Sequence, residues 1–499
     1  MQTSDSHPQH HQVIIVGTGF SGLGAAIRLK QENIHDFIVL DRGNDVGGTW
    51  RDNTYPGLTC DIPSDLYSFS YECNPNWSRH YSSQPEILDY LRYCAAKYGV
   101  YQHCRFQHNV ESMTWDERRN IWVVQTSKSV YTTNVILAGM GQLSEPKYPD
   151  IPGLDEFAKS GGKLFHSSRW DHHHNLNNRK VAVFGTGASA LQFVPVIQPK
   201  VKHMVLFQRT PHWIIPRDNH SRFIQRWLLR LLPFTKVLVR AYIFSFYELL
   251  GLFMNYWYKV LQTGQFIPKL LMYWQIKDPE MRKKLTPNYV MGCKRILISN
   301  EFYPAVTQPN VTLVTDKVAK IESQQIVMKD GTKHEVDTII IATGFHVSDH
   351  PMARIIRGRD GKLLSDVWKG EASAYKGSCV PGFPNLFIFM GPNTGSGHIS
   401  YVFLIECQAR YAVDAIKKMH SQRLSSIEVT EKAHNSYNEL IARKVKGTVQ
   451  SSGGCSSWYL ASTGKNTITF PDFGVVFYWN TRRFDIENYK TVRWSAKSE

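Results

Sequence analysis

The chain has 499 residues, enough for two to four domains, and it is rich in apolar material, with 42% hydrophobic and 12% aromatic residues. This composition excludes a disordered, collagen-like or low-complexity protein. Lysine and arginine exceed aspartate and glutamate by 58 − 42 = 16, which favours anionic partners such as phosphorylated cofactors or acidic membrane surfaces. Nucleic acid is not expected as a partner, because no zinc, helix-turn-helix or RNP pattern accompanies the charge.

The eight cysteines are scattered and form no C-x-x-C pair. We therefore expect neither a disulfide framework, nor a zinc ribbon, nor a dithiol redox centre. Residues 1–11 are polar and predict a disordered N-terminus without a secretory signal. The expected location is the reducing cytoplasm.

Residues 12–41 predict a strand, a glycine turn, a helix and a second strand. G-x-G-x-x-G follows the first strand directly, so a pyrophosphate is expected at the helix N-terminus. Nineteen residues beyond Gly22, the last glycine of this motif, Asp41 ends the second strand. A carboxylate there predicts hydrogen bonds to ribose hydroxyls, which favours FAD. The expected cofactor contacts here are Gly17, Gly19, Phe20, Ser21, Gly22, Asp41 and Arg42.

The same pattern returns over residues 180–209, with alanine in place of the third glycine. Here Arg209 occupies the position of the acid, and a guanidinium offers a planar donor fork to a phosphate. This contrast predicts a site for NADP; the alternative is a solvent-exposed arginine at a strand end. The expected contacts are Gly185, Thr186, Gly187, Ala188, Ser189, Ala190, Arg209 and Thr210.

Together the two patterns predict an α/β fold with two Rossmann-like dinucleotide-binding domains, the NADP domain being inserted into a discontinuous FAD domain. Two further apolar runs, at 338–345 and 385–391, have the composition of strands, and 400–420 that of a helix. Residues 450–480 are expected to be irregular with short strands. The expected boundaries are 1–11, 12–150 (FAD, first part), 151–164 (linker), 165–345 (NADP, with a helical insertion at 217–275) and 346–499 (FAD, second part, and C-terminal region).

One FAD site and one NADP site imply that hydride passes from NADPH to the flavin. Disulfide-reductase chemistry requires a redox cysteine pair beside the flavin, and no such pair is expected. Delivery of electrons to O2 is the favoured fate of the reduced flavin.

Residues 48–61, GTWRDNTYPGLTCD, resemble the G-x-W-x-x-x-x-[FY]-P-[GM]-x-x-x-D fingerprint of type I Baeyer–Villiger monooxygenases. A second fingerprint of that family, F-x-G-x-x-x-H-x-x-x-W-[PD], is matched at Gly162, His166, Trp170 and Asp171. Ser160 stands where its phenylalanine is expected, and Phe157 lies three residues early. The resemblance extends from about 12 to 480.

The resemblance implies that Arg295 lies beside the flavin, that Asp61 orients it, and that a C4a-peroxyflavin inserts one oxygen atom of O2 into a ketone to give an ester or lactone. A permanently protonated guanidinium suits this role, because it stabilises a peroxide and the oxyanion that follows. His166 is expected to be structural. The further implied cofactor contacts are Gly48, Thr49, Trp50, Tyr55, Asp61, Val110, Lys294, Ala342, Thr343, Gly344 and Asn393.

Two other functions stay open: N- or S-oxygenation of amines or sulfides by the same peroxyflavin, and a membrane-attached flavin reductase or binding module without oxygen insertion. The run His172, His173 and His174 lies in a polar segment without cysteine or acidic ligands at zinc spacing, so no metal is expected.

The segment 220–260 is basic and aromatic. Arg222, Arg226 and Arg230 are spaced by four residues and would share one helical face. Residues 241–258 are shorter than a bilayer-spanning helix requires and contain Glu248. The favoured interpretation is a helical insertion that packs on the NADP domain and roofs the substrate pocket; the alternative is peripheral membrane contact. Either suits a small lipophilic substrate. The oligomeric state is not predicted.

Overall fold

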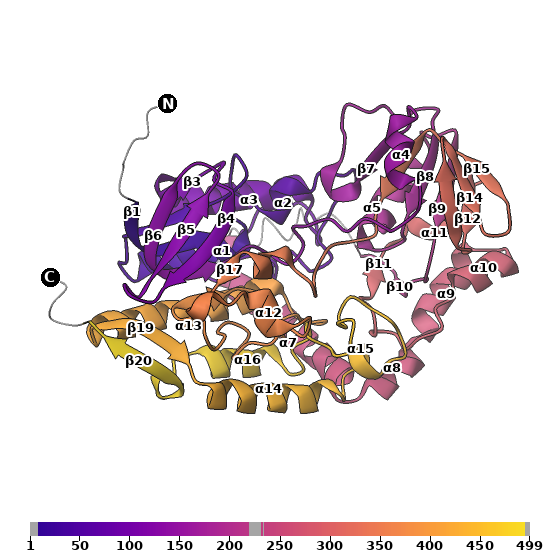
Figure 1. The fold of residues 1–499 in the computed structure, drawn as a ribbon. Coiled ribbons are helices and arrows are strands. Elements are labelled where there is room, and N and C mark those ends of the chain that lie inside the picture. Colours follow the sequence, from indigo (N-terminus) through magenta and orange to yellow (C-terminus); the bar gives the residue numbers. More distant parts are fainter. Residues whose placement is uncertain (1–7, 219–230, 233, 495–499) are drawn as a thin grey trace.

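The protein is described by a computed structural model over residues 8–218, 231–232 and 234–494. Two α/β units lie at opposite ends of the molecule, one mainly indigo and purple, the other magenta to orange (Figure 1). The yellow C-terminal helices lie beneath the first unit. The arrangement follows the predicted α/β class.

The first unit contains an eight-stranded sheet in the order β17-β4-β5-β6-β1-β2-β3, with β18 paired to β6. Its bounds are β1 (Gln9–Val16), β2 (Phe37–Leu40), β3 (Cys104–Arg105), β4 (Val110–Asp116), β5 (Ile121–Thr126), β6 (Val130–Ala138), β17 (Ile356–Arg357) and β18 (Leu386–Ile388). The strands β3, β2, β1, β6 and β18 run parallel. Because helices and loops cover both faces, β1 and β2 end in continuous buried apolar runs rather than alternating ones.

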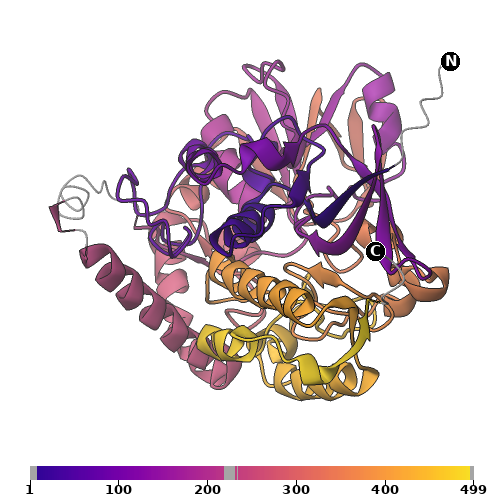
Figure 2. The same cartoon turned by 90° about the vertical axis from the view of Figure 1, so that its left-hand side faces the viewer.

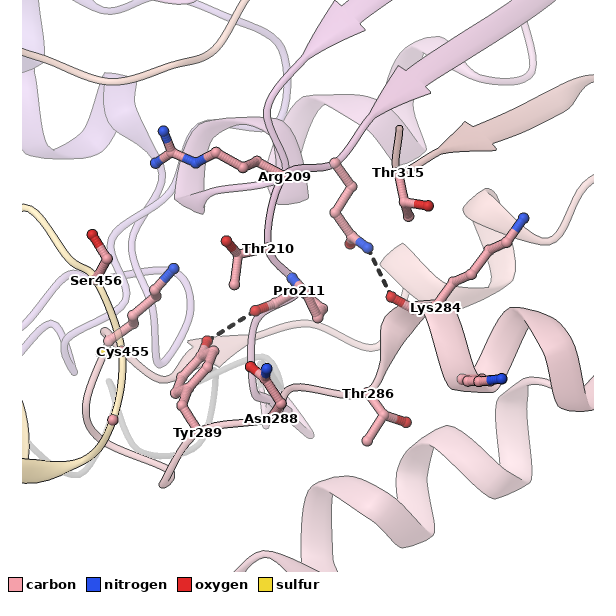
Figure 3. A pocket seen from close by; sticks show the side chains of 14 residues that line it. Arg209, Thr210, Pro211, Lys284, Thr286, Asn288, Tyr289, Thr315, Cys455 and Ser456 are labelled. Atoms are coloured by element: carbon pink, nitrogen blue, oxygen red, sulfur yellow. Dashed lines mark hydrogen bonds between the residues drawn. The ribbon is translucent and has the colours of Figure 1, made fainter. Parts of the chain in front are cut away.

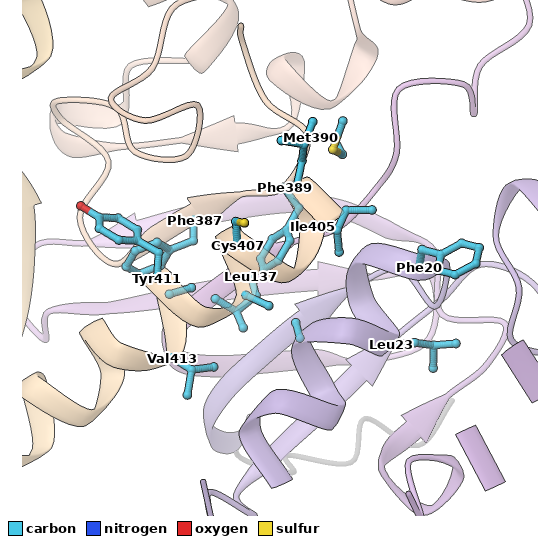
Figure 4. Close-up of a cluster of buried hydrophobic side chains, with 14 of the residues drawn as sticks. Phe20, Leu23, Leu137, Phe387, Phe389, Met390, Ile405, Cys407, Tyr411 and Val413 are labelled. Atoms are coloured by element: carbon cyan, nitrogen blue, oxygen red, sulfur yellow. The ribbon is translucent and has the colours of Figure 1, made fainter. Parts of the chain in front are cut away.

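Residues from both ends of the chain build one hydrophobic core in this unit. Leu23 of α1 (Phe20–Gln31) and Leu137 of β6 pack in the same cluster as Phe387 of β18 and Ile405 of α13 (Tyr401–Ser421) (Figure 4). A core shared by segments so far apart makes this domain discontinuous, as predicted.

The second unit is inserted between these segments. Its five parallel strands have the order β12-β9-β8-β16-β7. A three-stranded antiparallel sheet, β13-β14-β15, accompanies them. The bounds are β7 (Lys163–His166), β8 (Lys180–Phe184), β9 (His203–Phe207), β12 (Val311–Val314), β13 (Val318–Glu322), β14 (Gln325–Met328), β15 (Lys333–Glu335), β16 (Thr338–Ile341), α4 (Leu154–Lys159), α5 (Ala188–Ile197) and α11 (Phe302–Val306).

The helical insertion contributes α7 (Thr235–Asn255), α8 (Tyr258–Gly264), α9 (Phe266–Gln275) and α10 (Pro279–Leu285). The predicted face of Arg222, Arg226 and Arg230 lies outside the described residues. In Figure 2, α7 lies along one flank of the molecule beside the C-terminal helices. The prediction that the insertion packs on the NADP domain holds for α9, which contacts β10 (Ile214–Ile215), and for Leu261 of α8, which packs with Trp213. Most of α7 packs instead on the C-terminal part of the FAD domain, where Phe244 meets Phe403, and only its end, at Met254, reaches the NADP domain.

Three local differences from the predictions have tertiary causes. The strand β1 begins at Gln9, within the expected disordered segment, because residues 9–11 pair with β6. The expected linker 151–164 contains α4, whose Phe157 is fully buried. The expected irregular region 450–480 contains α16 (Gly474–Thr481), where Glu248 of α7 accepts hydrogen bonds from the Gly474 and Val475 N–H groups.

The remaining elements complete the two units. They are α2 (Thr49–Asp52), α3 (Gln84–Lys97), β11 (Leu297–Ile298), α12 (Leu364–Trp368), β19 (Leu424–Val429), α14 (Glu431–Val445), α15 (Val449–Ser452) and β20 (Tyr489–Arg493).

Candidate active site

The first glycine cradle lies between β1 and α1. Gly17 has φ +99°, and a Cβ there would lie 2.5 Å from the Gly139 carbonyl oxygen. A Cβ on Gly22 would lie 1.7 Å from the Gly17 carbonyl oxygen. Both positions therefore exclude a side chain, which keeps the turn tight and the first N–H groups of α1 accessible to a pyrophosphate. This cradle fits the phosphates of FAD.

Asp41 lies at this cradle, but its carboxylate is already fully hydrogen-bonded. One oxygen accepts from the Thr18 amide (2.7 Å) and hydroxyl (2.6 Å), and the other from the Gly43 amide (2.7 Å) and the Arg51 guanidinium (2.8 Å). A carboxylate has about four acceptor positions. A ribose hydroxyl would have to displace one of these donors, so the structure gives Asp41 a role in holding the turn that the sequence did not predict.

The fingerprint segment 48–61 joins the two domains. At its start, Gly48 touches the first cradle, since a Cβ on Gly48 would lie 2.8 Å from Cα of Gly19. In its middle, the buried Tyr55 hydroxyl donates to the side-chain oxygen of Gln192 on α5 (3.1 Å). At its end lies Asp61. The segment thus runs from the FAD cradle to the NADP domain.

The second cradle repeats the geometry of the first. Gly185 has φ +110°, and a Cβ there would lie 2.4 Å from the Ala342 carbonyl oxygen. Around Gly187, at the N-terminus of α5, nothing lies within 4 Å of a Cβ position. Ala190, in place of the third glycine, is fully buried. The open space at Gly187 lets a phosphate approach the backbone closely.

A basic cavity of about 500 Å³ opens beside this cradle (Figure 3). Arg209, Lys283, Lys284 and Lys294 line it together with Thr210 and Asn288. Burial, and next the charge of Arg209, lower the pKa of Lys294. Several cations in one cavity attract an anionic group, and a 2′-phosphate has that charge.

The turn Cys293-Lys294-Arg295 presents three consecutive side chains to three different partners. Lys294 faces the basic cavity and lies 5.3 Å from the ring centroid of Tyr289. Arg295 forms a bidentate pair with Asp61, with Nε–Oδ2 2.5 Å and Nη2–Oδ1 2.6 Å. Gly292, with φ +96°, precedes the turn. This turn therefore connects the NADP pocket to the Arg295–Asp61 pair.

Electrostatics hold Arg295 in its charged form. Burial by itself lowers the pKa of its guanidinium, but the charge and hydrogen bonds of Asp61 outweigh burial and raise the pKa above its ordinary value. Tyr401 and Tyr459 lie within electrostatic reach of the same guanidinium. The site thus contains a fixed positive charge with two oriented hydrogen bonds.

The third side chain of the turn corrects a sequence prediction. Cys293 is bonded to Cys455 in a disulfide that spans 162 residues, although no disulfide was expected from the cysteine spacing. Cys455 also lines the basic cavity. The bond joins the C-terminal loop to the turn that contains Lys294 and Arg295.

Comparisons with known proteins identify the chain. Residues 14–233 match the family described as pyridine nucleotide-disulphide oxidoreductase. A Baeyer–Villiger monooxygenase of Streptomyces coelicolor is 43% identical over 487 residues, which cover 97% of this chain and 93% of that relative. One of Pseudomonas aeruginosa is 44% identical over 491 residues, covering 98% and 93%. The chain belongs to the Baeyer–Villiger monooxygenases.

Solved structures agree with this assignment. Cyclohexanone monooxygenase from Rhodococcus sp. Phi1 bound to NADP⁺ matches with a TM-score of 0.86 and 26% identity, covering 98% of this chain and all of that one. OTEMO in complex with FAD and NADP matches with a TM-score of 0.86 and 26% identity, covering 97% and 100%. As a Baeyer–Villiger monooxygenase, the enzyme uses FAD and NADPH to insert one oxygen atom of O2 into a ketone, which confirms the predicted chemistry.

The second fingerprint of the Baeyer–Villiger monooxygenases lies where α4 meets β7. The buried Phe157 packs on Gly162, because a Cβ on Gly162 would lie 2.4 Å from that ring. Ser160 donates to the Phe157 carbonyl at the end of α4 (2.8 Å). His166 is fully buried and hydrogen-bonded to the Ser168 hydroxyl and the Gly344 carbonyl oxygen. Burial lowers the pKa of His166 to about 4, so the ring is neutral at pH 7.

Other predicted contacts of this Baeyer–Villiger monooxygenase form bonds within the protein. Arg42 donates to Glu145 and to the Ser144 carbonyl. Thr343 donates to the Lys147 carbonyl. The Asn393 amide donates to the carbonyls of residues 466 and 469. Val110 is buried at the start of β4. The remaining predicted contacts, Phe20, Ser21, Thr49, Trp50, Thr186, Ala188 and Ser189, lie on or beside the two cradles.

The histidine run is held by ordinary hydrogen bonds: His172 contacts the Thr54 hydroxyl and His174 the Thr338 hydroxyl. In the described part of the chain, no group of three histidine, cysteine or acidic side chains is placed to hold a metal ion.

Three functional contacts were missed from the sequence. Arg51 holds Asp41, and its place within residues 48–61 was an available signal. Gln192, a polar residue on an apolar helix, binds Tyr55 and both the amide and the carbonyl of Thr59. The approach of Cys455 to Cys293 had no local signal.

Proposed function

We propose that Arg295 is the catalytic residue of this Baeyer–Villiger monooxygenase and that Asp61 is its positioning residue. The observation that carries the proposal is their bidentate pair at the end of the segment that runs from the FAD cradle to the NADP domain. Asp61 uses the Nε donor and one Nη2 donor, so the guanidinium keeps its other N–H donors and its positive charge in one orientation without reorganisation. It would stabilise the negative charge that develops on the ketone oxygen during oxygen insertion.

FAD, held by residues 17–22 and the start of the segment 48–61, supplies the activation of O2 once NADPH has reduced it. The protein's own groups provide the rest. The glycine cradle binds the pyrophosphate, the Arg295–Asp61 pair orients the charge, and Tyr55 with Gln192 fixes the segment on which Asp61 lies. The neutral, buried His166 ties the interdomain connection to Gly344 and donates no proton to the reaction.

For NADPH, we propose that residues 185–190 bind the pyrophosphate and that Arg209 binds the 2′-phosphate, with Thr210 and Lys294 beside it. The four cations of the basic cavity support this assignment. The open backbone at Gly187 supports close approach of the pyrophosphate. Ala342, Thr343, Gly344 and Asn393 are proposed to border the cofactors.

We propose a small lipophilic ketone as the substrate. Aromatic side chains near Arg295, the buried Tyr459 and the partly buried Tyr401, support an apolar substrate. We also propose the predicted division into an FAD domain (12–150 and 346–499) and an NADP domain (165–345), and a cytoplasmic location with membrane contact through the described part of 220–260.

The test is to supply the purified holoenzyme with NADPH, labelled O2 and a panel of cyclic and long-chain ketones. An ester or lactone that contains one labelled oxygen, with one NADPH consumed per product, is the expected result. Formation of N- or S-oxides alone from matched amines and sulfides would contradict the assignment. Hydrogen peroxide without any oxygenated product would contradict it as well.

A further inference from the structure

Exposed apolar side chains are concentrated on the helical insertion. Of the 29 large hydrophobic side chains that are exposed in the described part of the chain, 16 lie between Leu231 and Trp274. Soluble proteins rarely expose large contiguous apolar patches unless the patch binds a partner or a membrane.

The two faces of α7 differ sharply. The inner face is packed against the protein and consists of Ile243, Tyr247, Gly251 and Met254. The outer face is exposed at Leu238, Tyr242, Phe246 and Leu249, which follow the same helical spacing. Tyr242 is 75% exposed and Phe246 57%. Among the residues that the structure describes, the outer face is therefore both apolar and exposed.

By length and composition alone, α7 could cross a membrane, and 11% of its most apolar stretch is buried. Its polar side chains fix it along the protein surface instead. Arg240 donates to the carbonyls of Asp65 and Ser68, and Glu248 accepts from the first N–H groups of α16. A spanning orientation would take both charges away from these partners and into hydrocarbon, which costs several kcal/mol.

The charges of this surface match an anionic lipid bilayer. Between residues 231 and 277 the chain has five cations and one acid. Arg240 is turned inward to the Asp65 and Ser68 carbonyls and Glu248 to α16, which leaves four lysines and no acid for the outer surface of this stretch. Exposed Lys259 and Lys269 alternate with exposed Trp257, Phe266 and Leu270. Lysines flanking aromatic and leucine side chains are typical of helices that lie in the membrane interface. A symmetric second copy fits poorly, because these lysines would face the same three helices, α7, α8 and α9, whose described residues include no exposed acid.

The inner face of α7 borders the active site. Tyr247 lies within electrostatic reach of Asp61 and Arg295. A Cβ on Gly251 would lie 2.5 Å from Nε2 of His398. The methyl group of Met254 lies 3.6 Å from the Cβ position of Gly292, which precedes the Cys293-Lys294-Arg295 turn. One helix thus separates the exposed apolar surface from the catalytic pair.

We propose that the outer faces of α7, α8 and α9 bind the surface of an anionic lipid bilayer, with α7 parallel to the membrane plane. A lipophilic ketone dissolved in the bilayer then enters the site beneath α7. The entry route rests on the proposed function, whereas the lipid contact rests on this surface alone.

The experiment is flotation of the FAD-loaded enzyme with two kinds of vesicle, phosphatidylcholine alone and phosphatidylcholine mixed with phosphatidylglycerol. The expected result is binding to the mixed vesicles that weakens at high salt. The double variant Leu238→Glu/Phe246→Glu should bind at least tenfold more weakly. Leu440→Glu, an exposed leucine on α14, is the matched control and should bind like the wild type.

Two results would overturn the proposal: failure of the wild type to bind the mixed vesicles, or unchanged binding of the double variant. A stable dimer that the double variant dissociates would assign the face to a second copy and would also overturn it. Flotation needs no turnover, so a failure of the ketone assay is distinguishable from a failure of lipid binding. Activity of the double variant should be unchanged on a water-soluble ketone and lower on a long-chain ketone supplied in vesicles.

Discussion

Replacing Arg295 by alanine should abolish ester formation and leave the reduction of FAD by NADPH nearly unchanged. The side chain forms two short hydrogen bonds with Asp61, and no other described acid is paired with it. Its proposed role lies after flavin reduction. The two half-reactions should therefore respond differently to its loss.

The magnitude follows from the geometry. Removing a single preorganised oxyanion donor costs about 10²–10³ in rate. Because the guanidinium fork carries the positive charge as well as the donors, we expect a loss of at least about 10³ in the oxygenation rate. Asp61→Ala leaves the guanidinium of Arg295 in place but removes the carboxylate that orients it, so a smaller loss of about 10–100-fold in the oxygenation rate is expected. Since the pair is about one quarter exposed, the cost in folding stability should stay within about 1–3 kcal/mol.

The assay follows anaerobic flavin reduction by stopped flow and ester formation by chromatography under O2. The double variant Arg295→Ala/Asp61→Ala should be no slower than Arg295→Ala, because Asp61 acts through Arg295. Arg119→Ala, which breaks an exposed arginine–aspartate pair, is the control and should change neither rate. Retained ester formation in Arg295→Ala, or losses that multiply in the double variant, would refute the assigned roles.

Three further predictions concern the surroundings of the site. Arg209→Ala should raise KM for NADPH about 10–100-fold and leave KM for NADH unchanged, since a charge-assisted hydrogen bond contributes about 1.5–3 kcal/mol; an equal change for both cofactors would contradict the 2′-phosphate role. Cys455→Ser should lower the free energy of unfolding by about 2–4 kcal/mol and raise KM for NADPH, and dithiothreitol should reproduce both effects in the wild type only; no change in melting temperature would contradict the bond to Cys293. The pKa of His166 is about 4 in the folded protein and about 6.5 in the unfolded chain, so between these pH values the folded state binds fewer protons. The free energy of unfolding should therefore fall by about 3 kcal/mol as the pH drops from 6.5 to 4. Urea titrations of His166→Gln should show a shallower pH dependence, and an identical slope would argue against a buried neutral ring.

The sequence by itself determined the two cradles and the class of chemistry. Gly22 is required by a local constraint, because a Cβ there would lie 1.7 Å from the Gly17 carbonyl oxygen, and a local constraint leaves a local motif. Gly17 is required by its φ of +99° and also by the Gly139 carbonyl oxygen of a distant segment, 2.5 Å from its Cβ position. The contrast between Asp41 and Arg209 and the match over residues 48–61 depend equally on short spacings. Such patterns can be recognised in the sequence because neighbouring residues determine each strand, turn and helix.

Other features depended on contacts between distant segments. Asp41 lies where the spacing predicts, yet Thr18, Gly43 and Arg51 occupy its oxygens. Only the tertiary structure brings Cys455 to Cys293 across 162 residues. It also decided that α7 packs on the C-terminal domain and leaves its outer face exposed. Hydrophobic periodicity identifies a helix with two apolar faces, but which face is buried depends on the surface against which the helix packs.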